Sequence, residues 1–146
     1  MRALVQRAAR AEVRVAGEAV GAIGPGLAVL LGVGRSDDEA AAVRLAGKVA
    51  RLRVFPDDDG RFDRSLLDTG GGALVVSQFT LYGDTRKGNR PSFTEAADPP
   101  RAEHLYEAFC AALRHAGVRL VATGRFGASM ELELVNEGPV TLLVET

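Results

Sequence analysis

The sequence is poor in cysteine and in large aromatic side chains, with one cysteine, no tryptophan and two tyrosines among 146 residues. A lone cysteine excludes an internal disulfide bond and fits a reducing compartment. Cys110 lies in a helical pattern beside Phe109 and Leu113, which is typical of a buried, small apolar residue. No convincing base accompanies it, so we do not expect a catalytic thiol.

Long apolar segments are absent as well. The longest run, Leu27–Leu31, is far too short to span a bilayer. Arg2, Gln6 and Arg7 interrupt the N-terminal segment before a signal-like apolar stretch develops. By elimination, we expect a cytoplasmic protein with no membrane partner.

Neither sign of charge is in clear excess, because 18 Lys and Arg stand against 19 Asp and Glu, for a net charge of −1. This balance excludes broad wrapping of nucleic acid, which needs a basic face. It is compatible with a protein that handles only the end of an RNA. Arg86, Lys87 and Arg90 form a local cluster in a glycine-containing loop and could meet a few phosphates; the alternative is solvated loop charge.

Ligand sets for metals and nucleotides are incomplete. The two histidines, His104 and His115, fall on one predicted helix, and no other plausible zinc ligands lie near them in the sequence. Gly32-Val33-Gly34 lacks the third glycine of a dinucleotide-binding loop. The segment from Gly83 to Gly88 lacks the lysine and hydroxyl residue that must follow a phosphate loop. We therefore predict no metal site and no cofactor.

The length and hydrophobic pattern predict a single domain over residues 1–146, without internal repeats or linkers. The predicted strands are Met1–Arg7, Glu12–Val15, Ala19–Ile23, Leu27–Val33, Leu52–Phe55, Ala73–Val76, Val118–Thr123, Met130–Val135 and Val140–Val144. This order favours an α/β domain with a mixed sheet, two main helices on one side and additional strands on the other.

Two helices separate the predicted strands. Ser36-Asp37-Asp38-Glu39 has the sequence of a capping box, and the helix that it opens should end near Ala50. The positions that we expect this helix to bury are Val43, Ala46, Val49 and Ala50. Asp98 should cap the second helix, which has Pro99-Pro100 in its first turn and ends at Gly117.

Two motifs stand out from this framework. Ser77-Gln78-Phe79-Thr80-Leu81 closes the apolar run Ala73–Val76. Asn136-Glu137-Gly138-Pro139-Val140-Thr141 lies between two strand-like runs. Proline has no N–H to donate within a sheet, and glycine removes the side chain that would keep another backbone or a ligand away. The second motif is therefore either a stiff piece of main chain with directed carbonyls or an ordinary hairpin corner.

Together, the two motifs resemble those of the D-aminoacyl-tRNA deacylase family at every defined position. The opening Met1–Arg7 and the loop Gly88–Phe93 are also similar to that family, and the resemblance extends over the whole chain. It implies a compact β/β/α layered fold and a homodimer with shared active sites. It further implies hydrolysis of the ester in D-aminoacyl-tRNA, and of glycyl-tRNA mischarged on tRNA-Ala, with the acceptor end of the tRNA as partner.

The resemblance assigns the catalytic site to Ser77, Gln78, Phe79 and Thr80. An aminoacyl ester is already activated, so the site needs mainly to orient it and to stabilise an oxyanion. The backbone N–H groups of Phe79 and Thr80 are our candidates for that stabilisation. The family also implies that the ribose 2′-hydroxyl helps to activate water. Thr80 as a nucleophile is the weaker alternative, because no histidine lies in either motif to serve as its base.

The resemblance assigns substrate binding and chiral filtering to Gly138, Pro139, Arg7 and Asn136. It implies a cis Gly138-Pro139 bond that reaches into the active site of a partner subunit. A rigid wall can exclude the L side chain by steric clash whatever the shape of that side chain, and glycine, which has no side chain, should not be excluded. Arg7 is a candidate to fix the carbonyls. The remaining hypotheses are a non-catalytic RNA-end binding module and a small nucleotide-dependent or metal enzyme.

Overall fold

The longest early strand, β1 (Arg2–Val15), organises the fold in the computed structural model, which describes residues 1–146. Its first half pairs antiparallel with β3 (Gly26–Gly32) on one side, and nearly its whole length pairs with β8 (Glu131–Glu145) on the other. Its second half pairs with β2 (Glu18–Ile23). The first half of β1 therefore lies in the layer of β3, β6 and β7, whereas its second half forms a second strand layer with β2 and the first part of β8.

Bulges allow β1 to change the face that it buries. The pairing with β8 shifts on either side of Ala8. Ala3 and Val5 belong to the larger hydrophobic cluster, whereas Ala11 and Val13 belong to the smaller one. An inserted residue in a strand re-aims every side chain after it, so these irregularities turn β1 from one core to the other.

The main sheet is mixed. Its hydrogen-bonded order is β2-β1-β3-β6-β7, with β8 on the other side of β1. Strands β6 (Gly72–Ser77) and β7 (Val121–Thr123) run parallel to β3. Both parallel strands follow a helix, as a crossover connection requires.

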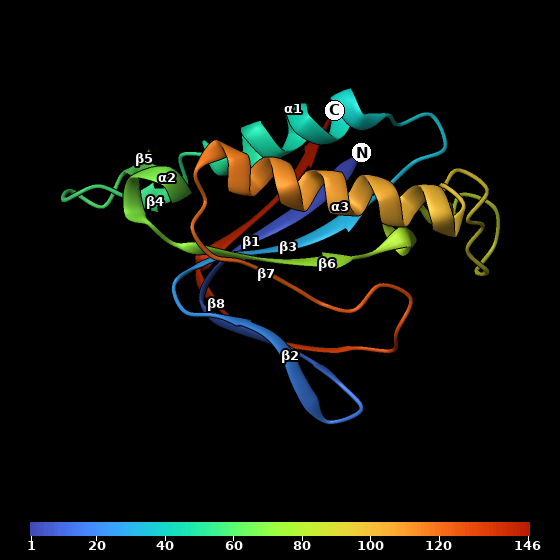
Figure 1. The fold of residues 1–146 in the computed structure, drawn as a ribbon, viewed down its shortest axis with the longest axis horizontal. Helices are drawn as coiled ribbons and strands as arrows, with labels where there is room; N and C mark the ends of the chain where they lie inside the picture. The colour runs from blue at the N-terminus through green and yellow to red at the C-terminus, as the bar shows by residue number, and fades with distance from the viewer.

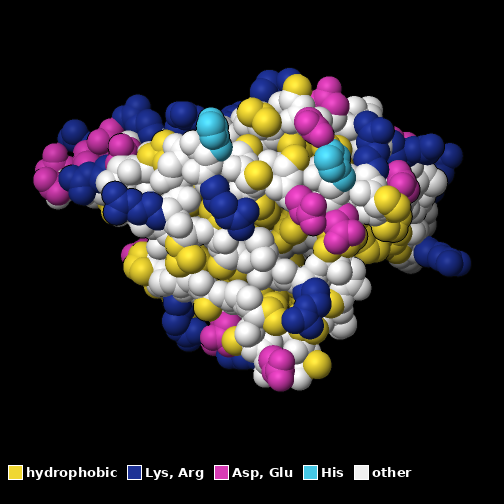
Figure 2. Space-filling view, viewed as in Figure 1, with side chains coloured by type: hydrophobic (Ala, Val, Ile, Leu, Met, Phe, Trp, Pro, Cys, Tyr) yellow, Lys and Arg dark blue, Asp and Glu magenta, His cyan; other side chains and the backbone are white.

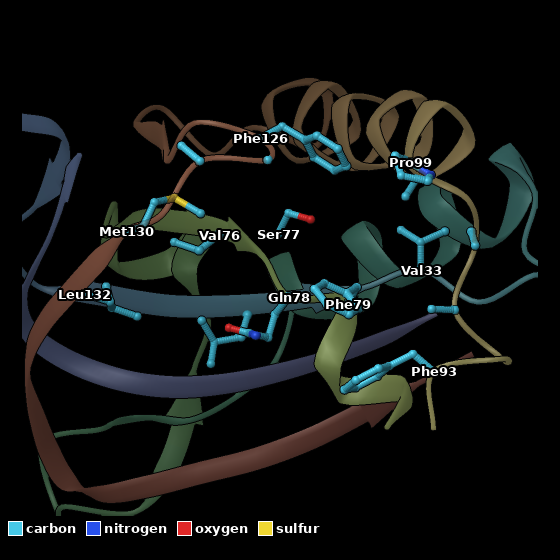
Figure 3. A pocket seen from close by; sticks show the side chains of 16 residues that line it. Val33, Val76, Ser77, Gln78, Phe79, Phe93, Pro99, Phe126, Met130 and Leu132 are labelled. Carbon is cyan, nitrogen blue, oxygen red and sulfur yellow. The ribbon is translucent and has the colours of Figure 1, made fainter. Parts of the chain in front are cut away.

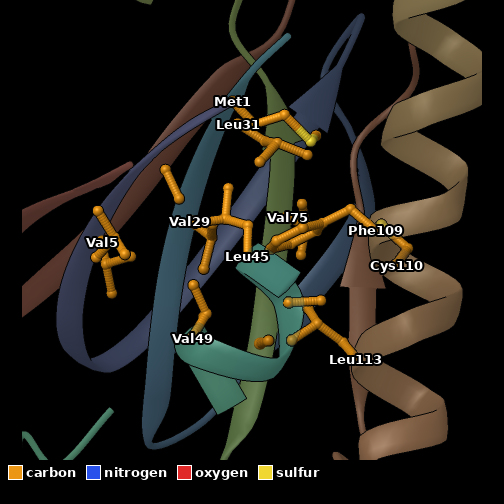
Figure 4. Close-up of a cluster of buried hydrophobic side chains, with 14 of the residues drawn as sticks. Met1, Val5, Val29, Leu31, Leu45, Val49, Val75, Phe109, Cys110 and Leu113 are labelled. Carbon is orange, nitrogen blue, oxygen red and sulfur yellow. The ribbon is translucent and has the colours of Figure 1, made fainter. Parts of the chain in front are cut away.

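Two helices, α1 (Glu39–Ala50) and α3 (Pro99–Ala116), lie side by side over one face of this sheet, and β2 lies on the opposite side (Figure 1). The larger cluster fills the space between helices and sheet, with Leu45, Phe109 and Leu113 against Val29 and Val75 (Figure 4). The smaller cluster fills the space between the strand layers. The predicted α/β domain with β/β/α layers and a mixed sheet is confirmed.

Short elements complete the chain. They are β4 (Phe55–Pro56), β5 (Phe62–Arg64), the one-turn helix α2 (Leu66–Thr69) and the 3-10 helix η1 (Phe79–Tyr82). No helix is both long and apolar enough to cross a lipid bilayer. On the face shown in Figure 2, cationic and anionic side chains are interspersed rather than segregated.

Several predicted boundaries are wrong. The separate strands Met1–Arg7 and Glu12–Val15 are one strand, β1. Met130–Val135 and Val140–Val144 are likewise parts of β8, so the Gly-Pro motif is an irregularity inside a strand and not a hairpin corner. The predicted strand Leu52–Phe55 is reduced to β4, since only its end pairs with β5.

The start of α1 also differs from the prediction. The N-cap is Asp38, whose carboxylate accepts the N–H of Ala41 at 2.8 Å, and no capping box begins at Ser36. Val43 is 57% exposed because the buried stripe of the helix runs through neighbouring positions. That stripe consists of Ala41, Ala42, Leu45, Ala46, Val49 and Ala50.

The two ends of α3 fall where they were predicted. Asp98 occupies the N-cap position, although its side chain makes no capping hydrogen bond. Gly117 ends the helix at a φ of 111°, a left-handed conformation that favours glycine.

Candidate functional site

The first motif lies where β6 leaves the sheet. Residues 73–76 are fully buried between the helices and the second strand layer, which explains their unbroken apolar character. At Gln78 the backbone N–H still donates to the carbonyl of Leu31 at 2.8 Å, and the chain then turns into η1. The motif is thus a strand end followed at once by a tight helical turn.

That turn presents main-chain donors. Phe79 and Thr80 open η1, and the first amides of a helix have no carbonyl of their own helix to bond. The following amides are used internally, because Leu81 N–H donates to Gln78 O at 3.3 Å and Gly83 N–H donates to Thr80 O at 2.9 Å. The amides of Phe79 and Thr80 thus lie on adjacent residues at the start of the turn, and amides in such a position are candidates to stabilise an oxyanion.

The Thr80 hydroxyl has no base beside it. It accepts a hydrogen bond from the side-chain amide of Gln78, which cannot remove a proton. His104 lies on α3 and is paired with Glu39 at 2.6 Å. Cys110 is buried, and that burial raises the pKa of its thiol to about 11. None of these groups forms a nucleophile and base pair.

A cavity of about 660 Å³ opens beside the motif and is lined mainly by apolar side chains. Ser77, Gln78 and Phe79 lie on one side of it, and Phe126 and Met130 lie across from them (Figure 3). Its size and apolar character suit a small organic group with a few polar attachment points.

An aromatic pair stands at this cavity. The Phe79 and Phe93 rings pack edge to face with centroids 5.0 Å apart. Both remain accessible, at 54% and 37% exposure, respectively. Exposed aromatic faces are suited to stacking on a base or on an aromatic amino-acid side chain.

The second motif is held by side chains from two strands. The Gly138-Pro139 bond is cis, as the family resemblance implied. The side-chain amide of Asn136 donates to the carbonyls of Arg7 and Val140, at 3.0 and 3.2 Å. Asn136 therefore bridges the interruption in β8 and ties it to β1.

Arg7 holds the same segment by hydrogen bonds from its guanidinium group. Only 8% exposed, it donates from Nη1 to Val54 O at 2.6 Å and from Nε to Glu137 O at 3.2 Å. Gly138 has a φ of +126°, and a Cβ there would lie 2.8 Å from Arg7 Nη2. Only glycine fits both the conformation and the contact.

The structure does not bring the two motifs together within one chain. Ser77 pairs with Leu31, which pairs with Ala3 on β1, whereas Gly138-Pro139 lies beside Arg7. Three strand spacings of ~4.8 Å and four residues of ~3.3 Å separate them, or roughly 20 Å in all. No side chain spans that distance.

The three residues of the predicted basic cluster are exposed, but only one of them forms an ion pair. Arg86 donates to both carboxylate oxygens of Asp84, with a shortest distance of 2.6 Å, and these hydrogen bonds lower the pKa of Asp84 to about 2. Lys87 and Arg90 have no ion pair. Only these two cations in the loop are free to meet a phosphate.

Sequence reasoning missed the far wall of the cavity. Phe126 and Met130 lie in the segment that connects β7 to β8 and carry no local signal, because only the assembled sheet places them opposite Ser77. Phe93 lay within the loop that matches the family, and its aromatic character was the one available signal.

The sequence comparisons match this chain to one protein family over nearly its whole length. The sequence model of D-Tyr-tRNA(Tyr) deacylase matches residues 4–145. A D-aminoacyl-tRNA deacylase of Roseiflexus sp. (strain RS-1) is 60% identical over 146 residues, covering 100% of this chain and 94% of its own. One of Thermus aquaticus is 59% identical over 146 residues, with 100% and 95% covered.

Two solved structures share the fold. A c-Myc DNA unwinding element binding protein superposes with a TM-score of 0.94 at 40% identity, covering 100% of this chain and 99% of its own. A probable eukaryotic D-amino acid tRNA deacylase has a TM-score of 0.87 at 19% identity, with 99% and 98% covered. At that lower identity the likeness speaks for the fold alone.

Proposed function

Because this chain belongs to the D-Tyr-tRNA(Tyr) deacylase family and is a D-aminoacyl-tRNA deacylase, we propose that it proofreads chirality with a main-chain filter shared between two subunits. The observation that carries the proposal is the separation of roughly 20 Å, within one chain, between the cis Gly138-Pro139 bond and the strand end at Ser77–Thr80, where Phe79 lines an apolar cavity. The substrate is the ester that joins a D-amino acid to the 3′ end of tRNA, and the reaction belongs to the cytoplasm.

The chemistry asked of this site is modest. Water attacks the ester carbonyl, the amides of Phe79 and Thr80 stabilise the oxyanion, and the tRNA ribose leaves with its hydroxyl restored. One such donor contributes roughly 3–4 kcal/mol of transition-state stabilisation. The ribose 2′-hydroxyl of the substrate helps to activate the water, so the protein needs no base of its own at Thr80.

The filter acts in a second copy of the chain. Within one chain, Gly138-Pro139 is roughly 20 Å from Ser77, so it can line an active site only if it belongs to a partner. Strand β8 pairs only with β1, so its other edge has no strand partner, and the strand carries the exposed apolar residues Val135, Leu142 and Leu143. An exposed edge with apolar side chains is suited to a two-fold dimer.

The direction of selection follows from the absence of a side chain at Gly138. Main chain at this position can lie against the substrate Cα and block the L side chain, whatever its shape. A D side chain points away from that wall, and glycine has none to be blocked. We therefore include glycyl-tRNA mischarged on tRNA-Ala among the substrates.

DNA binding, which describes one of the solved structures, is less favoured here. The net charge is −1, and the arginines of the second strand layer are largely neutralised, as Arg10 and Arg14 both pair with Glu133. Contact with a tRNA end through Lys87 and Arg90 needs only a few phosphates.

Two variants separate the parts of the proposed site. Phe79→Pro removes one amide N–H at the first residue of a helix, where proline is tolerated. It should lower D-Tyr-tRNA hydrolysis by roughly a hundred- to a thousandfold relative to Phe79→Ala, which keeps the N–H. Gly138→Ala places a methyl group against Arg7, disturbs the filter and should allow hydrolysis of L-Tyr-tRNA.

A heterodimer of these two chains, purified through two different tags, tests the sharing. If the filter acts across subunits, one of its sites combines the intact turn of the Gly138→Ala chain with the intact filter of the Phe79→Pro chain. That heterodimer should hydrolyse D-Tyr-tRNA and reject L-Tyr-tRNA as the wild type does. Continued hydrolysis of L-Tyr-tRNA, at about half the rate per dimer of the Gly138→Ala homodimer because only one turn is intact, would show that the filter acts within one chain.

A further inference from the structure

The last residues of η1 are held by charged groups that belong to neither motif. Arg2 donates from Nη1 to the carbonyl of Leu81 at 2.8 Å, and its guanidinium carbon lies 4.5 Å from the centroid of the Tyr82 ring. Its Nε is paired with Glu145 at 2.7 Å, which fixes the guanidinium from the other side. Arg2 thus joins η1 to the first and last strands of the chain.

Tyr82 is held at its opposite end by Asp37. The Tyr82 hydroxyl donates to Asp37 Oδ2 at 3.3 Å. The same carboxylate accepts the N–H of Gly34 at 2.6 Å and the amino group of Met1 at 2.6 Å. Burial and the neighbouring Asp37 raise the pKa of Tyr82 to about 12, so the hydroxyl stays protonated and remains a donor.

The end of β3 and the residues that follow it pack directly against η1. A Cβ on Gly32 would lie 3.0 Å from Leu81 Cβ, and one on Gly34 would lie 2.8 Å from Tyr82 Cε1. The absence of side chains at these two glycines lets the turn rest directly on the strand. The end of η1 is therefore held by three contacts. Arg2 binds the Leu81 carbonyl and lies over the Tyr82 ring, Asp37 accepts from the Tyr82 hydroxyl, and the backbone at Gly32 and Gly34 packs against Leu81 and Tyr82.

We propose that Arg2, Tyr82 and Asp37 are positioning residues, which hold η1 so that the amides of Phe79 and Thr80 face the ester carbonyl. This inference rests on the proposed function, because it takes those amides as the oxyanion donors. Four residues of 3-10 helix form one unit, so a tilt at Leu81 and Tyr82 is passed to the amides at its start. Arg2 and Asp37 contact the last residues of η1, and none of the three residues lines the cavity.

The contribution of Arg2 is to geometry more than to stability. Its side chain is 38% exposed, and an ion pair at that exposure adds little to the free energy of folding. A displacement of the reacting groups by about 1 Å, in contrast, can slow an enzyme about a hundredfold. The two effects can therefore be separated by experiment.

The test compares Arg2→Met with Arg2→Lys in single-turnover and steady-state hydrolysis of D-Tyr-tRNA. Methionine keeps the length of the side chain but loses the donor and the charge. We expect Arg2→Met to lower kcat by about a hundredfold, with KM and the melting temperature near wild-type values. Lysine can still donate to Leu81 and lie over Tyr82, so Arg2→Lys should recover most of kcat.

Arg51→Met is the matched control. Arg51 also donates to a backbone carbonyl, that of Gly47 at 3.2 Å, but it lies at the end of α1, away from η1. We expect this control to keep wild-type kcat. A similar loss of kcat in Arg51→Met would overturn the proposal, because the loss would not depend on η1.

Three other results would also overturn the positioning role. A fall in melting temperature that accounts for the lost activity would make Arg2 a purely structural residue. A raised KM with unchanged kcat would make it a tRNA contact. Wild-type kcat in Arg2→Met, while Phe79→Pro is inactive, would reject the positioning role and leave the proposed function intact. Full activity in both Arg2→Met and Phe79→Pro would reject the positioning role and also the proposed oxyanion donors.

Discussion

The Nε atom of Arg7 lies 3.2 Å from the carbonyl oxygen of Glu137, the residue that precedes Gly138-Pro139. A guanidinium has several donors in a fixed plane, so one side chain can hold this carbonyl and that of Val54 together. The orientation of the proposed filter therefore depends on a residue of β1.

We expect Arg7→Met to loosen the filter and to destabilise the fold. Two carbonyls lose a buried charged donor, which costs about 1–3 kcal/mol in the free energy of unfolding. Urea denaturation measures that cost, and the ratio of D-Tyr-tRNA to L-Tyr-tRNA hydrolysis measures the filter. A destabilised variant that still rejects L-Tyr-tRNA as strictly as the wild type would limit Arg7 to a structural role.

Thr80→Ala should keep most of the deacylase activity. The substitution leaves the backbone N–H in place and removes a hydroxyl that already accepts from Gln78. Rates with D-Tyr-tRNA should stay within about tenfold of wild type, since neither oxyanion donor is removed. A loss of a thousandfold in a folded variant, or an acyl group trapped on Thr80, would establish covalent catalysis.

The loop cations should contribute unequally to tRNA binding. Lys87→Gln together with Arg90→Gln should weaken binding and flatten its salt dependence, because each lost phosphate contact reduces counterion release by about one ion. The charge-neutral pair Asp84→Asn and Arg86→Gln is the control, since Arg86 is already held by Asp84. An effect of the control equal to that of the first pair would show that Arg86 leaves Asp84 to meet the RNA.

Asp68 should make stability depend on pH in the acid range. Hydrogen bonds from the backbone N–H and then the hydroxyl of Ser65 lower the pKa of this carboxyl from its usual 3.8. A carboxyl that ionises more readily in the folded chain stabilises the fold above its unfolded pKa, and this stabilisation is lost as the pH falls through the lower, folded value.

Asp68→Asn removes the titrating group and should flatten this acid-side decline. The stability difference from wild type should be largest near neutral pH and should shrink below pH 3.8. Asp59→Asn is the control, because Asp59 is an exposed carboxylate with no side-chain partner in the neighbouring turn. Equal curves for Asp68→Asn and wild type would remove the capping interaction as a source of pH dependence.

Features with a local cause could be predicted from the sequence. The end of α3 at Gly117 and the buried strand Ala73–Val76 are set by a glycine and by an apolar run, and both lie where predicted. The cis bond at Gly138-Pro139 followed from the resemblance, because the motif is a short, contiguous string.

Features set by distant contacts could not be predicted in this way. The capping box at Ser36 did not form because Asp38 caps the helix instead and the Glu39 carboxylate is paired with His104 on α3. Strands β1 and β8 were each divided in the prediction, since their bulges interrupt the alternation by which a strand is recognised. The separation of the two motifs required the assembled sheet.

The pairing of β1 with β8 has a consequence for biosynthesis. The strand made first has the strand made last as its partner along nearly its whole length. During translation the edge of β1 that β8 will cover stays open until the C-terminal residues leave the ribosome. Non-local pairing of this kind slows folding and prolongs exposure of strand edges to other chains. Strand β8 therefore completes the pairing of β1, and the same strand contains Gly138-Pro139.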